Sequence, residues 1–323
     1  MLMSVVAIVV GFILLVWGAD RFVLGASATA RCFGVSPMIV GLTIVGFGTS
    51  APELLVSGVA AWNGNPGLAI GNALGSNITN IALVLGVAAL IRPLDVHSQT
   101  LRRELPVLLL VMAFGLVLLL DAELGRGDGL LLLFGLGLMV YWMVTLGLRS
   151  RTDPLSGEFD AEMPEQMPVG RALTWLALGM IVMFVGSRLL VNGAVEIAHY
   201  LEVSDLIIGL TVIAIGTSLP ELAATIMSAL RNEHDIAIGN VIGSNMFNLL
   251  GVMGLPGVLA PAVLEPGVLT RDYPLMIGLT LALFAMAYGL KGGHGRVNRI
   301  EAALLVGVYF GYLYVLYRSS VAG

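Results

Sequence analysis

The amino-acid sequence predicts an all-α polytopic membrane protein: ten transmembrane helices as two inverted five-helix repeats, with both termini extracytoplasmic. Three observations predict this architecture. The chain is 58% hydrophobic and 11% charged, with a mean hydropathy of +0.95; it contains ten long apolar stretches; and one polar motif occurs twice. A soluble domain is excluded, because a water-exposed surface needs far more charge.

Each apolar stretch is long enough to cross the hydrocarbon core of a bilayer, which takes about 20 helical residues. The first stretch follows no basic segment and precedes no small-residue cleavage site, so we expect an uncleaved helix rather than a signal peptide. In chain order the expected spans are 3–27, 36–61, 68–91, 104–121, 127–148, 171–198, 204–230, 236–260, 272–290 and 297–318.

Basic residues are unevenly distributed between the connections. If the first connection is cytoplasmic, eleven basic residues lie inside and only Arg126, Arg271 and Arg318 lie outside. The eleven are Arg31, Arg92, Arg102, Arg103, Arg149, Arg151, Arg171, Arg231, Lys291, Arg296 and Arg299. This asymmetry predicts extracytoplasmic termini. An odd number of spans per repeat then reverses the second copy, so we expect inverted repeats.

The chain divides into a first five-helix repeat at 1–148, a cytoplasmic acidic linker at 149–170 and a second five-helix repeat at 171–323. Residues 41–86 and 209–254 align without insertion and are identical at 20 of 46 positions. The linker lacks EF-hand spacing, so a solvated connection is favoured over a calcium-sensing segment. The single cysteine, Cys32, excludes an internal disulfide, and the dispersed basic residues make nucleic acid an implausible partner.

The repeated motif predicts an opened helix in each half. It reads Gly-Thr-Ser-Ala-Pro-Glu at 48–53 and Gly-Thr-Ser-Leu-Pro-Glu at 216–221. Pro52 has no N–H to donate and its ring pushes against the carbonyl of Gly48; Pro220 and Gly216 repeat this pair. Non-helical backbone at membrane depth is tolerated only where it is buried in protein or lines a polar cavity.

Hydroxyl, amide and carboxylate groups surround these expected breaks. Thr49 and Glu53 are four residues apart and share a helix face, with Ser50 one position round. In the next span Asn72, Ser76 and Asn80 form a stripe at spacings of four. The second copy supplies Thr217, Ser218, Glu221, Asn240, Ser244 and Asn248.

Packed across a pseudo-two-fold axis, the halves would bring Glu53 and Glu221 into one oxygen-rich pocket without histidine or thiolate. All-oxygen coordination suits calcium and alkali cations, whereas zinc or copper would ask for His or Cys. Without a cation the two carboxylates repel each other, so at least one could take a proton. Calcium, sodium ions and protons would then compete for one site, as an antiporter requires.

The paired motifs Gly-Thr-Ser-x-Pro-Glu and Gly-Ser-Asn-x-x-Asn resemble the two alpha-repeats of the cation/calcium exchanger superfamily, which includes sodium/calcium exchangers. The bacterial inner-membrane branch is the most similar. The resemblance implies alternating access by movement of the first and sixth helices against the rest. It implies ion binding by Thr49, Ser50, Glu53, Ser76, Asn80, Thr217, Ser218, Glu221, Ser244 and Asn248.

The sequence departs from this family at one position of the site. Many members carry an acid where this chain has Asn248, so here the site holds two formal negative charges instead of three. We expect a calcium:sodium antiporter of the bacterial cytoplasmic membrane that contributes to calcium homeostasis, with a calcium/proton antiporter as the alternative. The bilayer and the transported cations are its expected partners; neither a cofactor nor an obligate protein partner is evident.

Two other function classes are weaker. Residues 125–128, Gly-Arg-Gly-Asp, match an intramembrane aspartyl protease pattern, but they fall in a short outer connection without a partner aspartate in a span, so a turn and helix start is favoured and we expect no enzyme. A cation channel could use the same oxygen ligands. Inverted repeats with one central site favour a carrier.

Overall fold

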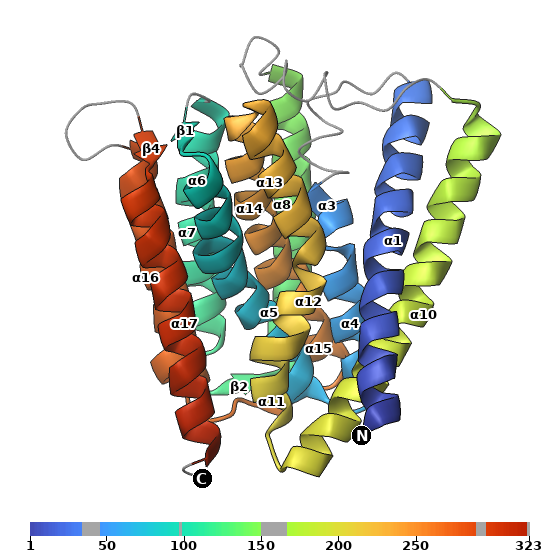
Figure 1. The fold of residues 1–323 in the computed structure, drawn as a ribbon, viewed down its shortest axis with the longest axis vertical. Coiled ribbons are helices and arrows are strands. Elements are labelled where there is room, and N and C mark those ends of the chain that lie inside the picture. Colours follow the sequence, from blue (N-terminus) through green and yellow to red (C-terminus); the bar gives the residue numbers. More distant parts are fainter. Residues whose placement is uncertain (34–45, 97–98, 150–166, 289–294, 322–323) are drawn as a thin grey trace.

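A computed structural model describes residues 1–33, 46–96, 99–149, 167–288 and 295–321. Within these ranges the fold is an all-helical, polytopic membrane fold (Figure 1). Each of the ten expected spans coincides with helical segments, although 36–61 is described only from residue 46. The linker is described only at residue 149 and from 167 to 170, so the repeat boundaries remain a prediction.

Seven helices of the described part are long and apolar enough to cross a membrane, and an eighth crossing arises if one bent pair is counted as one span. The bent pair joins 205–217 to 219–231 at an angle of 43°. The number of ten crossings therefore stays a prediction. Six helices run without a break: α1 (Leu2–Cys32), α7 (Gln99–Leu118), α8 (Arg126–Arg149), α10 (Val169–Leu201), α16 (Tyr273–Tyr288) and α17 (Arg299–Val321).

The interior is built from broken helices. In the first half these are α3 (Gly46–Thr49), α4 (Ala51–Trp62), α5 (Pro66–Thr79), η2 (Asn80–Leu85) and α6 (Gly86–Ile91). In the second half they are α11 (Asp205–Ile208), η3 (Gly209–Ile213), α12 (Ala214–Thr217), α13 (Leu219–Arg231), α14 (His234–Phe247), η4 (Asn248–Val252) and α15 (Gly254–Leu259). Figure 1 shows α3 and α4 running towards the end of the molecule that holds both termini, and α12 and α13 running away from it.

Four short π-helical segments occur in the described ranges, three within these broken helices and one directly before α16, and the sequence did not predict them. They are η2, η3, η4 and η5 (Val268–Asp272). A π-helical turn holds one extra residue, which changes the direction of the side chains that follow. Apolar periodicity could not reveal η2 and η4, because every residue of these two segments except Leu83 is buried, so no exposed face marks the change in helical period.

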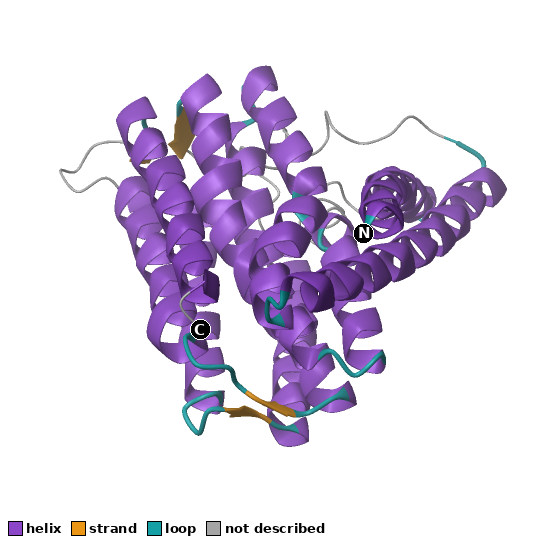
Figure 2. Cartoon of the chain, turned by 60° about the horizontal axis from the view of Figure 1, so that its bottom comes forward, coloured by secondary structure: helices purple, strands orange, loops and turns teal. Residues whose placement is uncertain are grey.

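Two short strand pairs were also not predicted. β1 (Leu94–Val96) pairs antiparallel with β4 (Gly295–Val297), and β2 (Glu123–Leu124) with β3 (Ala262–Val263). Figure 2 shows one of these ribbons clearly, away from the membrane-spanning helices. Beside β2, the Gly125 N–H donates to the Asp128 carboxylate over 2.8 Å as α8 begins, so the turn-and-helix-start interpretation of 125–128 is confirmed.

Helices α1 and α10 form a pair along one side of the molecule (Figure 1). Gly18 and Gly179 lie so close that a Cβ on either would contact the backbone of the other helix. Small residues permit this approach in membranes, where packing rather than apolar burial holds helices together. The pair contacts the interior chiefly through α4 and α3.

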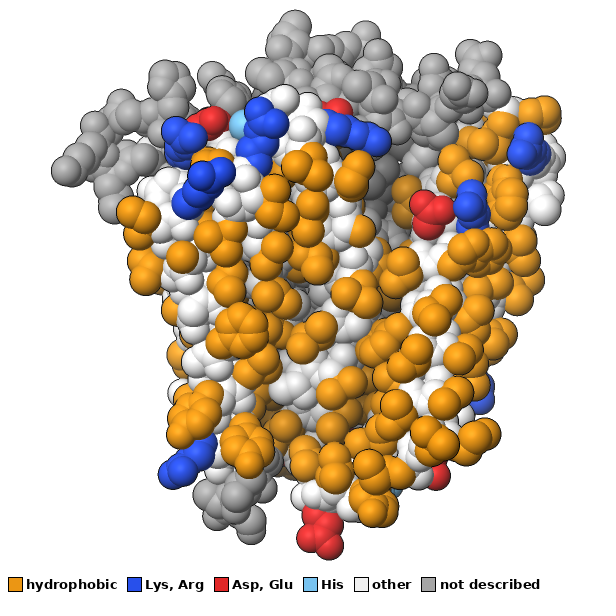
Figure 3. Space-filling model, in the orientation of Figure 1, with side chains coloured by type: hydrophobic (Ala, Val, Ile, Leu, Met, Phe, Trp, Pro, Cys, Tyr) orange, Lys and Arg blue, Asp and Glu red, His pale blue; other side chains and the backbone are white. Residues whose placement is uncertain are grey.

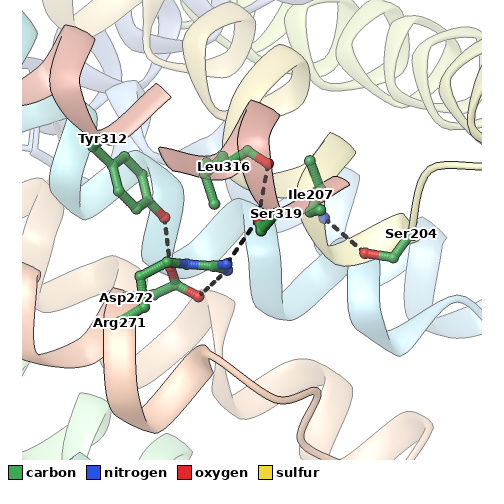
Figure 4. A network of polar contacts seen from close by, with 7 residues as sticks. All are labelled: Ser204, Ile207, Arg271, Asp272, Tyr312, Leu316 and Ser319. Carbon is green, nitrogen blue, oxygen red and sulfur yellow. Dashed lines mark hydrogen bonds and ion pairs between the residues drawn. The ribbon is translucent and has the colours of Figure 1, made fainter. Parts of the chain in front are cut away.

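The surface and the helix ends fit a membrane environment. Figure 3 shows apolar side chains over the height of the helices and charged side chains at the two ends. Figure 4 shows one polar contact at the end with the termini: Arg271 binds Asp272 through Nε at 2.7 Å, and the Tyr312 hydroxyl donates to the same carboxylate at 2.8 Å. Asp272 is fully buried, and its bond to Tyr312 joins η5 to α17.

Candidate functional site

Both copies of the repeated motif break their helix at the serine. Ser50 (φ −84°, ψ 1°) separates α3 from α4, and Ser218 (φ −81°, ψ 7°) separates α12 from α13. Pro52 and Pro220 lie in the first turn of the helix that follows, where a missing N–H costs nothing. The breaks that the prolines predicted are therefore present.

All ten predicted site residues are buried, and each exposes 6% of its surface or less. Glu53 and Glu221 are fully buried, one on α4 and one on α13. Neither forms an ion pair with a basic side chain within the described ranges. A buried carboxylate without a counter-charge is costly, so these two positions are candidates for binding a cation.

Threonine hydroxyls connect each break to the opposite half. The Thr49 hydroxyl donates to the Asn240 side-chain oxygen at 3.2 Å and lies 3.2 Å from the Ser244 hydroxyl. The Thr217 hydroxyl donates to the Asn72 side-chain oxygen at 3.1 Å and lies 3.5 Å from the hydroxyl of Ser76. The broken helix of each half therefore contacts the polar stripe of the other half.

Serine hydroxyls reach both carboxylates. Ser218 donates to Oε1 of Glu53 and Ser244 to Oε1 of Glu221, each over 3.4 Å. Glu53 thus receives its hydroxyl from the second half, and Glu221 from the following helix of its own half. The serine and threonine bonds together involve seven of the ten predicted residues. The other three lie at interruptions of the helices: Ser50 forms the break before α4, Asn80 begins η2 and Asn248 begins η4.

Several buried oxygens in this region have no hydrogen-bond partner among the described residues. They are Oε2 of Glu53, Oε2 of Glu221, Oγ of Ser50, Oδ1 of Asn80 and Oδ1 of Asn248. Buried polar atoms are nearly always paired in folded proteins. The only unpartnered nitrogen of these side chains is Nδ2 of Asn248, so the unsatisfied groups are overwhelmingly acceptors, which is the arrangement that a hard cation would satisfy.

The stripe residues Asn72 and Asn240 were noted in the sequence but not assigned as ligands, and they hold the site together. The Asn72 amide donates to the backbone oxygen of Glu53 at 3.1 Å and to the Ser57 hydroxyl at 2.9 Å. Asn240 donates to the Thr225 hydroxyl at 3.2 Å. Ser57 and Thr225 occupy matching positions of the repeat, so conserved spacing between the halves could have found this pair.

Asn77 and Asn245 link the two stripes to each other. The Asn245 amide donates to the Asn77 backbone oxygen at 3.3 Å, and its own side-chain oxygen accepts from the Asn80 amide at 3.1 Å. Both contacts join helices of different halves of the chain. The counterpart of the second bond, from Asn248 to Asn77, is missing among the described contacts, so the site is not symmetric in detail.

The π-helical segments begin at two of the predicted ligands. η2 starts at Asn80 and η4 at Asn248. Such bulges occur frequently at functional sites, because the extra residue redirects a side chain without ending the helix. Spacings of four in the sequence could not predict where each asparagine side chain points.

Helix α1 covers both breaks. A Cβ at Gly216 would overlap the ring of Phe12, and a Cβ at Gly48 would overlap the side chain of Val23. The glycines of both motifs therefore serve two purposes: they precede the break, and they admit an apolar side chain of α1 against the backbone beside the site.

Comparisons with known proteins match one family along nearly the whole chain. A family model described as sodium/calcium exchanger protein matches residues 3–145 and 171–318. The putative antiporter CaxA of Alkalimonas amylolytica is 49% identical over 320 residues, covering 99% of this chain and 100% of the relative. The inner membrane protein YrbG of Escherichia coli is 43% identical, with 99% and 98% covered.

A named archaeal exchanger and a solved exchanger structure are also similar to this chain. The sodium/calcium exchanger MaX1 of Methanosarcina acetivorans is 31% identical, with 96% of this chain and 97% of the relative covered. The structure of the sodium-calcium exchanger NCX_Mj soaked with Na⁺ and Sr²⁺ superposes with a TM-score of 0.68 at 34% identity, covering 97% of this chain and 98% of that chain.

Proposed function

Because the chain belongs to the sodium/calcium exchanger protein family and is thus a membrane cation antiporter, we propose that it exchanges calcium for sodium by alternating access. Calcium is taken up at the region around Glu53 and Glu221, and sodium ions occupy the same region in exchange. The transported ions are its only proposed ligands; no cofactor and no obligate protein partner is part of the proposal. The family is one of transporters, not enzymes.

The observation that carries the proposal is the set of unpartnered buried oxygens between the two broken helices. Carboxylate, amide and hydroxyl oxygens are the donors that calcium and sodium prefer, and the site offers no imidazole or thiolate. Two carboxylates offset the charge of one calcium ion. We assign Thr49, Ser50, Glu53, Ser76, Asn80, Thr217, Ser218, Glu221, Ser244 and Asn248 as its ligands, with Asn72 and Asn240 positioning them.

We further propose ten spans in two inverted five-helix repeats, 1–148 and 171–323, joined by a cytoplasmic linker, with extracytoplasmic termini in a bacterial cytoplasmic membrane. The opposite directions of α4 and α13 support the inversion (Figure 1). Movement of α1 and α10 against the interior would expose the site to one side and then the other. Their close pairing supports a common movement.

Proton coupling is the second candidate. Asn248 stands where an acid could supply a third charge, and the two buried carboxylates have no basic partner among the described side chains, so protons could replace calcium instead of sodium. A channel would use the same oxygens without coupling.

Calcium flux in proteoliposomes tests the proposal and separates the candidates. Under an imposed sodium gradient at constant pH we expect calcium to move against the direction of sodium movement. Calcium movement driven only by a pH gradient would favour the proton antiporter. Calcium flux without any counter-ion would indicate a channel, and no flux under either gradient would contradict exchange altogether.

A further inference from the structure

Exposed arginines gather at the rim of the molecule opposite the termini, where α6, α13 and α17 meet. Arg92 follows α6, Arg231 ends α13, Arg296 lies on β4 and Arg299 begins α17. All four are exposed. Figure 3 shows basic side chains at this rim directly above a band of apolar side chains. We call these four residues the arginine rim.

Contacts between the elements make the arginine rim one continuous surface. Arg92 Nη1 donates to the backbone oxygen of Leu230 at 3.4 Å, which joins the end of α6 to the end of α13. Arg299 Nη2 donates to the backbone oxygen of Ile91 at 3.4 Å, which joins α17 to α6. Each bond is long and uses one of the five donors of a guanidinium group, so most of this donor capacity is directed outward.

Two acidic residues beside the rim have partners other than Arg92 and Arg299. Asp95 pairs with Arg296 at 3.3 Å and lies 3.7 Å from Nδ1 of His234. The Glu301 carboxylate accepts the backbone N–H of Asn298 at 2.8 Å at the start of α17. Within the described residues neither carboxylate pairs with Arg92 or Arg299, so these two guanidinium groups keep their positive charge available at the outer surface.

Large aliphatic side chains lie next to the arginines along the chain and face outward. Ile91 precedes Arg92, Leu230 precedes Arg231 and Ile300 follows Arg299; their exposed fractions are 44%, 49% and 75%. An apolar side chain below a basic one fits the boundary between acyl chains and head groups. A soluble anionic partner would gain nothing from the aliphatic residues.

We propose that the arginine rim binds an anionic phospholipid, with Arg92 and Arg299 on its phosphate and Ile91 and Ile300 against its acyl chains. Arginine binds phosphate oxygens through paired N–H donors, and basic sites between helices on the cytoplasmic side suit such head groups. The inference is independent of which ions the protein exchanges. The lipid would then join α6 to α17 beside α13; α13 carries Glu221, and α6 continues the helix that carries Asn80.

Thermal unfolding of the purified full-length protein in neutral detergent tests the proposal, with phosphatidylglycerol titrated against phosphatidylcholine. We expect phosphatidylglycerol alone to raise the midpoint. In Arg92→Gln/Arg299→Gln the phosphatidylglycerol concentration that gives half of the stabilisation should rise about 30-fold. Each basic residue near an anionic membrane surface contributes about a 5-fold gain in binding, and the variant loses two of them. The matched control, Arg126→Gln/Arg318→Gln, changes two exposed basic residues at the opposite end and should respond like the wild type.

Three further results decide the outcome. Equal stabilisation by both lipids, or an unchanged response in Arg92→Gln/Arg299→Gln, would overturn the proposal. Glycerol phosphate that protects as well as the lipid would overturn it too, because the site would then recognise a free phosphate. If the double glutamine variant does not fold, Arg92→Lys/Arg299→Lys and Arg296→Gln replace it: the first should keep most of the phosphatidylglycerol response and the second should weaken it.

Discussion

At the scale of single residues, two buried glutamates are the assigned ligands on which the proposed exchange depends. Each is fully buried, and each has one carboxylate oxygen on a serine hydroxyl and the other without a partner in the described structure. Hydroxyl donors favour the ionised form, while burial opposes it. A bound cation resolves this conflict, so the charge on the carboxylates should be indispensable for transport.

Glu53→Gln and Glu221→Gln should each reduce calcium exchange at least about 100-fold. The amide keeps the size of the side chain but removes one of the two charges that offset calcium, and a buried charge interaction of about 3 kcal/mol corresponds to that factor. Calcium uptake into proteoliposomes under a sodium gradient measures this. Glu123→Gln, an exposed glutamate on β2, is the control and should transport normally; normal transport by both site variants would refute the assigned ligands.

Alanine variants of Asn248 and Asn245 should differ: the first should affect calcium binding and the second the stability of the fold. Both amide atoms of Asn248 lack partners among the described residues, whereas Asn245 bonds Asn80 and the backbone of Asn77. Asn248→Ala should therefore weaken apparent calcium affinity with little loss of thermal stability. Asn245→Ala should lower the free energy of unfolding by about 1–3 kcal/mol, because it leaves buried groups unpaired. Flux titrations and thermal unfolding of both variants measure the two effects, and the reverse pattern would contradict the assignment.

At the scale of elements, the site depends on helices that are interrupted at chosen points. The breaks at Ser50 and Ser218 open the backbone, and the π-helical starts at Asn80 and Asn248 redirect the opposing side chains. Helix α1 then packs over both breaks through Val23 and Phe12. An interruption within a helix is tolerated here because the interior buries it completely.

Gly216→Ala should abolish exchange because its methyl group would overlap the ring of Phe12. Phe12→Ala removes that ring, so Gly216→Ala/Phe12→Ala should recover a substantial part of the activity that the single glycine variant loses. Initial exchange rates of the wild type, both single variants and the double variant complete the cycle. Additive losses would show that Gly216 is required for the break itself and not for the approach of α1.

At the scale of the whole molecule, two structurally related halves contribute to one site. Thr49 of the first half bonds Asn240 of the second, and Thr217 of the second bonds Asn72 of the first. Neither half alone contains a complete set of these contacts. In the proposed mechanism, a relative movement of the halves or of the α1–α10 pair would change access to the site.

Cysteine labelling should establish the orientation. Cys32 is exposed at the end of α1 and is the single cysteine, so on intact cells a membrane-impermeant maleimide should leave it unlabelled. In a Cys32→Ser background, Glu123→Cys on β2, at the end of the molecule that holds the termini, should be labelled from outside (Figure 1). Labelling of permeabilised cells is the control, and the opposite pattern would reverse the proposed topology.

The sequence by itself determined the helical membrane fold and the helix breaks, and it selected the polar residues of the candidate site. These follow from local properties: apolar length, the missing N–H of Pro52 and Pro220, and a repeat that kept its register. Tertiary structure alone decided which groups meet. The crossed threonine bonds, the π-helical turns at Asn80 and Asn248, the strand pairs and the seating of Phe12 on Gly216 depend on contacts between distant helices, which no local pattern encodes.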